Sequence, residues 1–427
     1  MNFAILFIGK TLSFLSKNLN LGHGSTWPGH IALSLNPNFV SDVFKNSKTK
    51  IVLITGTNGK TTTAKLIKTI FEKNGKTVFT NSSGANLLNG IASSIIINSN
   101  LRTLNADFAI FEVDENALTQ VSEKLKPDFL IALNLFRDQL DRYGEIDTIS
   151  GHWKTIYNKL KIKTEFILNA DDPQIAYLGM SKGYKKSYFG LDDFSLQSQS
   201  YQHAADSTLC PKCSAKLKYE VLYYSHLGNW SCLNCGLKRP QLELSKSNFY
   251  PLDGIYNRYN TIAASLLAIK NGMSIKNIDQ ALREFKPAFG RQETIQVKNK
   301  KIKFFLAKNP TSFNESLRTI KDLNAKNLLI ILNDKIPDGR DVSWIWDIDF
   351  EILLDQETSI FLSGDRVYDI ALRLKYAGID NFNIYADLKV AVTEALKATP
   401  LEETLYILPT YSAMLETRKI LTGKKIL

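Results

Sequence analysis

The stretch Ile51-Val-Leu-Ile-Thr55 runs directly into Gly56-Thr-Asn-Gly-Lys60-Thr-Thr-Thr63, and this junction decides the fold. Four consecutive apolar residues followed by a threonine are typical of a strand that is buried on both faces of a parallel sheet. The two glycines permit a tight turn, and residues 64–71 continue as a helix whose positive N-terminus faces the same point. The segment therefore predicts a strand, a phosphate-binding loop and a helix in succession.

The side chains of this loop suit a nucleoside triphosphate. Lys60 is placed to reach the β- and γ-phosphates, and the hydroxyl of Thr61 or Thr62 is placed to ligate Mg²⁺. A solvent loop that only caps a helix is the alternative, and the strand and helix on either side disfavour it. The residues that we expect to contact ATP here are Gly56, Thr57, Asn58, Gly59, Lys60, Thr61 and Thr62.

The spacing of the glycines narrows the class of enzyme. Only Thr57 and Asn58 separate them, whereas the general phosphate loop has four residues in that position. This shorter form resembles the ATP loop of the Mur ligases and the folylpolyglutamate synthases. Those enzymes convert a carboxylate and ATP into an acyl phosphate, and an amine then displaces the phosphate. The resemblance implies an ATP-dependent ligase that forms a carbon–nitrogen bond.

Composition sets outer bounds on domain number and partners. A chain of 427 residues is too long for one hydrophobic core and suggests two or three domains. Its 44% apolar and 22% charged residues are ordinary for a globular protein. The net charge of +11 favours an anionic partner, which leaves nucleotide, nucleic acid and an acidic membrane surface open.

Apolar runs of strand length alternate with segments of helix length along most of the chain. They predict an α/β fold with a mostly parallel sheet, followed by a second, smaller α/β domain. The expected strands lie at residues 77–80, 108–111, 129–133, 166–168, 327–332, 359–362 and 404–408. We expect an N-terminal segment at 1–48, an ATP-binding domain at 49–296 with an insertion at about 206–240, and a C-terminal domain at 297–427.

The N-terminal segment is apolar but has neither a charged start nor a small-residue cleavage site, so we do not expect a secretory signal. Its apolar residues recur at near-helical spacing, interrupted by Lys10 and Lys17, which predicts an amphipathic helix. Packing on the body of the protein is the first interpretation, and contact with a membrane surface is the second. No run is long enough to cross a bilayer.

Carboxylates follow the strand expected at 108–111. Glu112 and Asp114 lie where the carboxyl end of that strand would meet the phosphate loop, and Mg²⁺ prefers such oxygen ligands. Glu112 resembles the metal-binding glutamate of the Mur ligases, and a surface charge is the alternative.

Three further motifs resemble the Mur family in the expected order. Residues 134–145 resemble its signature with Asn and Asp-x-x-Gly, but Gln139 replaces the usual metal-binding histidine, and Lys154 is a candidate for the family's carbamoylated lysine. Asn257 and Asn260 match the asparagines that bind adenine, although asparagine is also an ordinary helix cap. Arg291 matches the arginine that contacts phosphate, where a fixed fork of donors suits phosphoryl charge.

All four cysteines form two C-x-x-C pairs, and this spacing is typical of a zinc ribbon. The expected zinc ligands are Cys210, Cys213, Cys232 and Cys235, and free buried thiols are the alternative. Clustered cysteines indicate metal binding in a reducing cytoplasm more than disulfides. The aromatic residues Tyr219, Tyr223, Tyr224 and Trp230 are expected to pack the ribbon, with base stacking as the alternative.

The motifs after residue 307, together with the ribbon, resemble one branch of the Mur family, the MurT-like synthetase subunits of lipid II isoglutaminyl synthase. The matching segments are 308–314, 332–334, 338–341, 343–350, 364–366 and 409–415. Members amidate the α-carboxylate of D-isoglutamate in the lipid II stem peptide, with ATP and with ammonia from a glutaminase subunit in a heterodimer. The resemblance implies ATP, Mg²⁺ and Zn²⁺, and a cytoplasmic enzyme, at the inner face of the membrane if the N-terminal segment contacts lipid.

The same resemblance assigns a carboxylate to the partner's active site. In that family the C-terminal domain lends an aspartate to the Cys-His pair of the glutaminase, and we expect this to be Asp349, with Asp347 as the second choice. A solvated acid near a tryptophan-rich strand end is the alternative. Lys60, Glu112 and Asp349 are therefore the expected catalytic residues.

Two other functions stay open at this point. A Mur or folylpolyglutamate type ligase would join an amino acid in place of ammonia and would need no partner. A basic ATP-binding zinc protein would engage nucleic acid with a steep salt dependence. We rank the nucleic-acid-binding protein last of all, because that function needs neither the carboxylates nor the many nucleotide motifs. We therefore expect no nucleic-acid partner.

Overall fold

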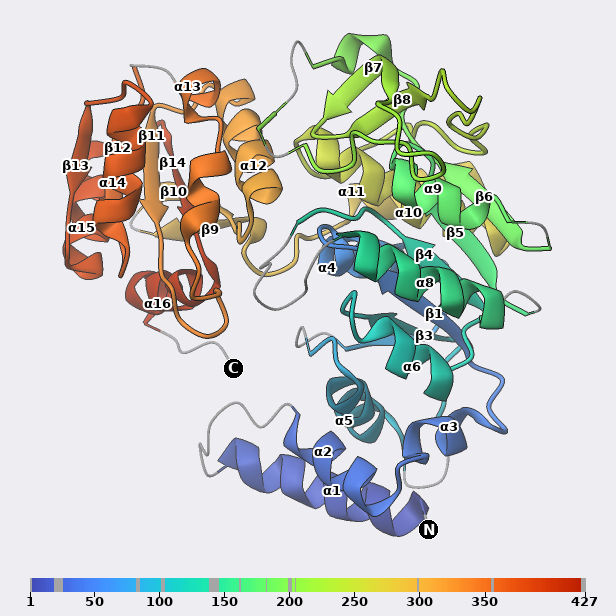
Figure 1. Ribbon diagram of the computed structural model, residues 1–427. Coiled ribbons are helices and arrows are strands. Elements are labelled where there is room, and N and C mark those ends of the chain that lie inside the picture. The colour runs from blue at the N-terminus through green and yellow to red at the C-terminus, as the bar shows by residue number, and fades with distance from the viewer. Residues whose placement is uncertain are drawn as a thin grey trace.

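The computed structural model describes residues 2–18, 26–81, 85–100, 104–137, 146–160, 163–181, 183–198, 202–203, 205–297, 299–354 and 357–423. Two α/β domains lie side by side, with short helices below the first and a small β-ribbon above it (Figure 1). The predicted fold class, a parallel-sheet domain followed by a smaller α/β domain, is confirmed.

The first domain is built on a six-stranded parallel sheet with the order β2-β3-β1-β4-β5-β6. Its strands are β1 (Lys50–Thr55), β2 (Val78–Thr80), β3 (Phe108–Glu112), β4 (Phe129–Ala132), β5 (Glu165–Asn169) and β6 (Lys185–Phe189). The chain adds β3 on one side of β1 and β4 on the other, so the carboxyl end of β1 lies at the point where ligands bind in open α/β sheets.

Strand β1 is buried on both faces, as its unbroken apolar run predicted. Ile51 and Leu53 pack into one core, whereas Val52 and Ile54 pack into the other. The first core is covered by α5 (Leu88–Asn98), α6 (Leu118–Lys124), α8 (Ile146–Leu160) and α9 (Pro173–Gly179). The second is covered by α4 (Lys60–Lys73), α10 (Ile255–Lys270) and α11 (Ile275–Arg283).

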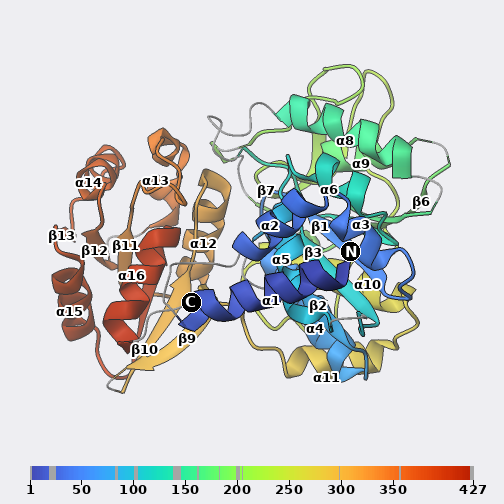
Figure 2. The same ribbon diagram turned by 90° about the horizontal axis from the view of Figure 1, so that it is seen from below.

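Three N-terminal helices extend the first core: α1 (Asn2–Asn18), α2 (Trp27–Leu35) and α3 (Phe39–Phe44). Ile5 and Leu6 of α1 are buried, and α1 packs against α2 and α5. The predicted N-terminal helix and its packing on the body of the protein are confirmed. The opposite side of α1 forms the underside of the molecule (Figure 2).

The insertion forms a two-stranded antiparallel ribbon of β7 (Lys218–Tyr224) and β8 (Leu227–Ser231), preceded by the 3-10 turn η1 (Phe194–Leu196). Tyr223, Tyr224 and Trp230 are each at most 2% exposed. Trp230 packs with the cysteines as expected, but Tyr223 and Tyr224 pack into the second core of the first domain, so the expectation that they pack the ribbon was wrong for these two. Tyr223 and Trp230 are therefore not available for stacking on bases, whereas Tyr224 lines a cavity between the two domains. Tyr219 packs against the small core around the cysteines.

The second domain has a six-stranded sheet with the order β13-β12-β11-β14-β10-β9, in which only β9 and β10 pair antiparallel. Its strands are β9 (Arg291–Val297), β10 (Lys300–Phe305), β11 (Asn327–Ile331), β12 (Ser359–Ser363), β13 (Phe382–Ile384) and β14 (Thr404–Pro409). Its helices are α12 (Pro310–Asp322), α13 (Phe350–Leu353), α14 (Val367–Tyr376), α15 (Leu388–Ala398) and α16 (Tyr411–Thr422).

One local expectation was wrong. The tryptophan-rich segment before Asp349 is the 3-10 helix η2 (Ser343–Asp347), not the end of a strand. Its Ile345 points into the core while Trp346 stays half exposed, a pattern that a short helix produces. Among the described helices, none has the length and apolar character needed to span a bilayer.

Candidate active site

The phosphate loop lies between β1 and α4 and has the backbone that its glycines predicted. Gly56 and Gly59 have φ angles of +129° and +91°, a region that side chains disfavour. A Cβ on Gly59 would lie 2.1 Å from Oδ1 of Asn260 in α10, and one on Gly56 would lie 2.9 Å from the carbonyl oxygen of Asn134. Both glycines are therefore required by space as well as by backbone angle.

Asn134, which follows β4, holds the loop from one side. The N–H of Asn58 donates to Asn134 Oδ1 at 2.8 Å, and Asn134 Nδ2 donates to the carbonyl of Asn58 at 3.0 Å. The N–H of Thr57 donates to the Asn134 carbonyl, and its hydroxyl donates to the carbonyl of Phe136 at 3.1 Å. The N–H groups of Thr57 and Asn58 are thus used to anchor the loop to Asn134. The N–H groups in the first turn of α4 have no partner within the helix and are left for an anion.

The ammonium group of Lys60 lies over the loop. It donates to the carbonyls of Gly56 and Thr57 and to Glu115 Oε2, the last at 3.1 Å. Burial alone would raise the pKa of Glu115, but the charges of Lys60 and Lys308 outweigh it and hold the pKa below its usual value. Sequence reasoning did not single out Glu115 or Lys308, which the fold brings to the phosphate loop from the turn after β3 and from the second domain.

Thr61 and Glu112 form an oxygen pair beside the loop. The Thr61 hydroxyl donates to Glu112 Oε2 at 2.6 Å, close to the roughly 3 Å between neighbouring oxygen ligands of octahedral Mg²⁺. Burial raises the pKa of Glu112, and the Thr61 hydroxyl, Arg291 and Lys60 offset part of this rise. Thr62 faces the neighbouring cavity, so the geometry favours Thr61 over Thr62 as a metal ligand.

Asp114 takes a different position from Glu112. One of its carboxylate oxygens accepts a hydrogen bond from the N–H of Asn116 at 3.1 Å, and its carbonyl accepts one from Leu118. It therefore shapes the turn into α6.

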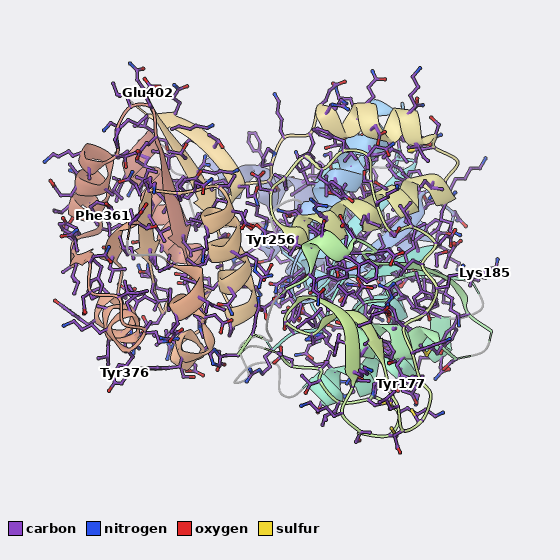
Figure 3. All side chains as sticks on the ribbon, turned by 90° about the horizontal axis from the view of Figure 1, so that it is seen from above. Tyr177, Lys185, Tyr256, Phe361, Tyr376 and Glu402 are labelled. Carbon is purple, nitrogen blue, oxygen red and sulfur yellow. The ribbon has the colours of Figure 1, made fainter. Side chains whose placement is uncertain are left out.

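A cavity opens beside the loop, lined by residues of both domains. One of them is Tyr256, which lies between the two domains (Figure 3). The cavity wall also includes Asn257 and Asn260 of α10, Arg291 of β9, and residues of α12. Asn260 Nδ2 donates to Asn257 Oδ1 at 3.1 Å, and Asn260 Oδ1 accepts from Thr63 at 3.3 Å. The sequence-predicted adenine and phosphate contacts are thus brought together around one space.

Arg291 supplies a test of whether an anion fits this space. Its Nε is buried and has no hydrogen-bond partner. Burial lowers the pKa of the guanidinium, and the negative charge of Glu112 opposes this effect. A buried donor without an acceptor costs about 1–3 kcal/mol, and a phosphate oxygen would remove that cost. The residues present therefore fit a nucleoside triphosphate.

The second domain contributes Asp349, which is only 3% exposed. Its Oδ2 accepts from Asn314 Nδ2 of α12 at 3.0 Å, and its N–H donates to Asn314 Oδ1 at 2.9 Å. Its Oδ1 lies 2.5 Å from Nδ1 of His203, an exposed histidine in the segment that leads to the ribbon. The expected alternative, a solvated acid, was wrong for Asp349. Asp347 is 39% exposed and lies 3.6 Å from Arg137.

The four cysteine sulfurs lie within 4.8 Å of one another. Sγ of Cys210 is 3.6 Å from that of Cys235, and Sγ of Cys213 is 3.5 Å from that of Cys232. These distances are too long for disulfides and close to the roughly 3.8 Å between sulfurs bound 2.3 Å from a tetrahedral Zn²⁺. A hydrogen bond from the Asn234 side chain lowers the pKa of Cys213 to about 6, whereas burial raises the pKa of Cys210 to about 12. A bound zinc ion would favour the thiolate form of both. The donor set fits zinc.

Comparison with known proteins agrees with this geometry. Residues 54–268 match the Mur ligase middle domain, and residues 306–414 match the MurT ligase C-terminal domain. The "Lipid II isoglutaminyl synthase (glutamine-hydrolyzing) subunit MurT" of Streptococcus pneumoniae is 33% identical over 99% of this chain and 97% of its own length. The chain belongs to the MurT family of Mur ligases.

Further relatives extend this assignment. The MurT subunit of Staphylococcus aureus strain COL is 32% identical over 84% of each chain. Among solved structures, a pseudomurein peptide ligase type C from Methanothermus fervidus superposes with a TM-score of 0.69 at 23% identity, covering 90% of this chain and 81% of that one. At this level of identity, the superposition shows a shared fold only.

Two of the expectations based on family resemblance concern Gln139 and Lys154. Gln139, with the rest of segment 138–145, lies outside the described residues. Lys154 is exposed on α8, with Nζ 5.9 Å from the centre of the Tyr177 ring. Several residues of the site were missed from the sequence, among them Glu115, His203 and Glu315. No local sequence motif marks these residues, because their partners are distant in the chain.

Proposed function

We propose that this chain is the synthetase subunit of a lipid II isoglutaminyl synthase, which amidates the α-carboxylate of D-isoglutamate in the lipid II stem peptide. The observation that carries the proposal is similarity over almost the full chain to proteins with that name. The match of the second domain to the MurT C-terminal model favours this reaction over the amino-acid ligation of other Mur enzymes.

In the proposed reaction, a carboxylate oxygen of the substrate attacks the γ-phosphorus of ATP, and the bond to the β,γ-bridging oxygen breaks to release ADP. Ammonia then attacks the acyl carbon, the bond to the phosphate oxygen breaks, and the amide loses a proton. The amine thus displaces phosphate, a far better leaving group than oxide.

The residues around the loop support these steps. Lys60 can exchange a present contact for a phosphate oxygen, and Arg291 offers its unpaired Nε to the developing charge. Thr61 and Glu112 are the groups that would hold Mg²⁺, whose chemistry here is to neutralise phosphate charge. Roles for Asn257 and Asn260 at the base rest on their position in the cavity wall.

A separate glutaminase subunit is proposed as the source of ammonia. The chain has four cysteines, all of them in the cluster that fits zinc, so none is left as a glutaminase nucleophile. Asp349 contacts the imidazole of His203 and so already orients one histidine ring. The catalytic histidine of a glutaminase partner would likewise need a carboxylate that orients its ring.

The surface near Asp349 supports docking of that partner. Trp346, Ile352, Leu372 and Tyr376 are between 47% and 73% exposed, and the rings of Trp346 and Tyr376 stack edge to face at 5.4 Å. Such exposed aromatic groups are typical of protein interfaces.

The main test uses the chain purified with its co-expressed partner, lipid II, ATP and glutamine. We expect ADP and a lipid II product lighter by the difference between a hydroxyl and an amino group. Lys60→Ala should lower ADP formation roughly 100-fold or more, because it removes a charge that stabilises the transferring phosphate. Lys65→Ala, an exposed lysine on the same helix, is the matched control.

Other outcomes would reject the proposal. ADP formation that needs a free amino acid, with a heavier product, would indicate an ordinary Mur-type ligase. Tight, salt-sensitive binding of DNA or RNA without ADP formation would indicate the non-enzymatic alternative.

Contact with the inner face of the membrane is part of the proposal, and α1 supports it. Phe3, Phe7 and Phe14 are 55–66% exposed, and the first acidic residue of the chain is Asp42. An apolar helix without acids suits an anionic lipid surface.

Phe7→Glu and Phe14→Glu should reduce co-sedimentation with phosphatidylglycerol vesicles, because each inserts a negative charge into the apolar surface of α1. Leu401→Glu, at an exposed position of the second domain, is the control. Equal binding by all variants would remove α1 from the membrane proposal.

A further inference from the structure

A second unpaired polar atom lies in the wall of the cavity beside the phosphate loop. Glu315 of α12 is only 2% exposed, and its Oε2 is buried without a hydrogen-bond partner. A carboxylate oxygen in such a place is costly unless a donor approaches it, so it points to a ligand group. Glu315 belongs to none of the motifs that indicated nucleotide binding.

The other oxygen of Glu315 is already held. Gln202 Nε2 donates to Oε1 at 2.7 Å, and an Arg318 guanidinium nitrogen lies 3.7 Å from the same atom. Gln202 is itself buried and comes from the segment before the ribbon. These contacts fix the orientation of the carboxylate group, and with it the position of Oε2 in the cavity wall.

The position of Glu315 along α12 indicates which part of a nucleotide it meets. The helix is capped by Asn309, whose side chain contacts Asn58 of the phosphate loop at 3.2 Å. Six residues further, Glu315 is about 9 Å along the helix axis from this contact. Tyr224 and Tyr256 line the same cavity, which supplies aromatic surface beyond the phosphates.

We propose that Glu315 is a nucleotide-specificity residue whose Oε2 accepts a hydrogen bond from a donor of the bound nucleoside, either a ribose hydroxyl or the exocyclic amine of the base. The two sources offer the same chemistry to the carboxylate. Glu315 and Arg291 then act as a complementary pair, with an acceptor for the nucleoside at one point of the cavity and a donor for phosphate at another.

This contact links the nucleotide to the second domain. The residue before Glu315 is Asn314, which holds Asp349, and the residue after Gln202 is His203, which contacts the same aspartate. The nucleoside contact therefore adjoins the residues around Asp349 on both segments. The inference rests on the proposed function only in taking ATP as the ligand.

The experiment measures binding of Mg²⁺ with ATP, 2′-deoxy-ATP, 3′-deoxy-ATP and purine riboside triphosphate to the full chain by calorimetry. We expect wild type to bind one analogue roughly 10- to 100-fold more weakly than ATP, the range for a hydrogen bond to a charged group. The analogue that loses affinity identifies the donor. Glu315→Leu should bind ATP and that analogue equally.

Two variants complete the design. Glu315→Gln keeps the shape and one acceptor oxygen, so it should retain part of the discrimination, and it serves if Glu315→Leu does not fold. Lys321→Ala, at an exposed position of the same helix outside the cavity wall, is the control and should keep the wild-type ratio.

Equal affinity of wild type for ATP and all three analogues would overturn the inference, as would an unchanged ratio in both Glu315 variants. Failure of wild type to bind ATP at all would instead contradict the proposed function, so the two failures are distinguishable.

Discussion

At the scale of single residues, the site depends on close approaches that tolerate little change. Gly59 passes under Asn260, Asn134 holds the backbone of the phosphate loop, and Thr61 bonds to Glu112. The loop was predictable, because glycine spacing and the lysine are local signals. The partners of the loop were not all predictable: Glu115 carries no local signature, and Lys308 lies in a segment that resembles the family but gives no sign that it contacts the loop.

Gly59→Ala should weaken ATP binding roughly tenfold or more, because displacing Asn260 by an ångström misplaces groups around the nucleotide. Gly75→Ala is the matched control: its φ is also positive, at +74°, but no atom lies within 4 Å of its Cβ. It should cost about 1 kcal/mol of stability and leave ATP affinity unchanged. Calorimetry and thermal unfolding separate the two effects, and equal ATP affinities would contradict the steric argument.

The raised pKa of Glu112 predicts a pH dependence of metal-nucleotide binding. Because the carboxyl holds its proton to a higher pH than the usual value of 4.5, Mg²⁺·ATP affinity should fall as the pH is lowered toward that raised pKa. Glu112→Gln should bind more weakly and show a flatter profile. Titration of ATP at several pH values, with saturating Mg²⁺, checks this.

Without ligand, the same group affects stability with the opposite trend. The native state binds the Glu112 proton more tightly than the unfolded chain does, so the contribution of Glu112 to the free energy of unfolding falls as the pH rises from 4.5 through the raised pKa.

For the metal-binding prediction, an identical pH profile of Mg²⁺·ATP affinity in wild type and Glu112→Gln would show that Glu112 is not part of the metal site.

At the scale of elements, α12 and the ribbon connect the two domains. Asn309 caps α12 through a reciprocal capping box with Ser312, a local arrangement worth about 1 kcal/mol. From the ribbon, the carbonyl of Tyr223 accepts a hydrogen bond from Arg318 of α12 at 3.1 Å, and Tyr224 lines the cavity beside the phosphate loop. The ribbon therefore forms part of the wall of the site.

Disruption of the cysteine cluster that fits zinc should consequently weaken nucleotide binding as well as the ribbon. Cys232→Ser should reduce bound zinc, lower the free energy of unfolding by about 3 kcal/mol or more, and reduce ATP affinity. Leu233→Ser, at a position 79% exposed in the same turn, is the control. Metal analysis, thermal unfolding and calorimetry provide the measurements, and unchanged ATP affinity with zinc lost would separate the ribbon from the site.

At the scale of the whole molecule, the cavity beside the phosphate loop is lined by residues from both domains, and the second domain also carries Asp349. α12 has Glu315 facing the cavity and the adjacent Asn314 holding Asp349. One helix thus borders the proposed sites of phosphorylation and ammonia supply.

Asp349→Asn should lower glutamine-dependent amidation of lipid II by roughly 100-fold or more, because a neutral amide cannot stabilise a charged histidine. The rate with free ammonium should stay close to that of wild type. Asp347→Asn, two residues away and exposed, is the matched control and should preserve both rates. Equal loss with both nitrogen sources would reject a role of Asp349 in the partner's active site.

The sequence by itself determined the alternation of strands and helices, the phosphate loop and the cysteine cluster, because these depend on periodicity, glycine and spacing within short segments. It also indicated Asp349, but only through family resemblance, and its local pattern suggested a solvated acid. Only the tertiary structure decided that Asp349 is buried between Asn314 and His203, and that Glu315 and Arg291 have unpaired atoms in one cavity. Hydrogen bonding and burial are properties of surroundings, and here those surroundings come from segments more than a hundred residues apart.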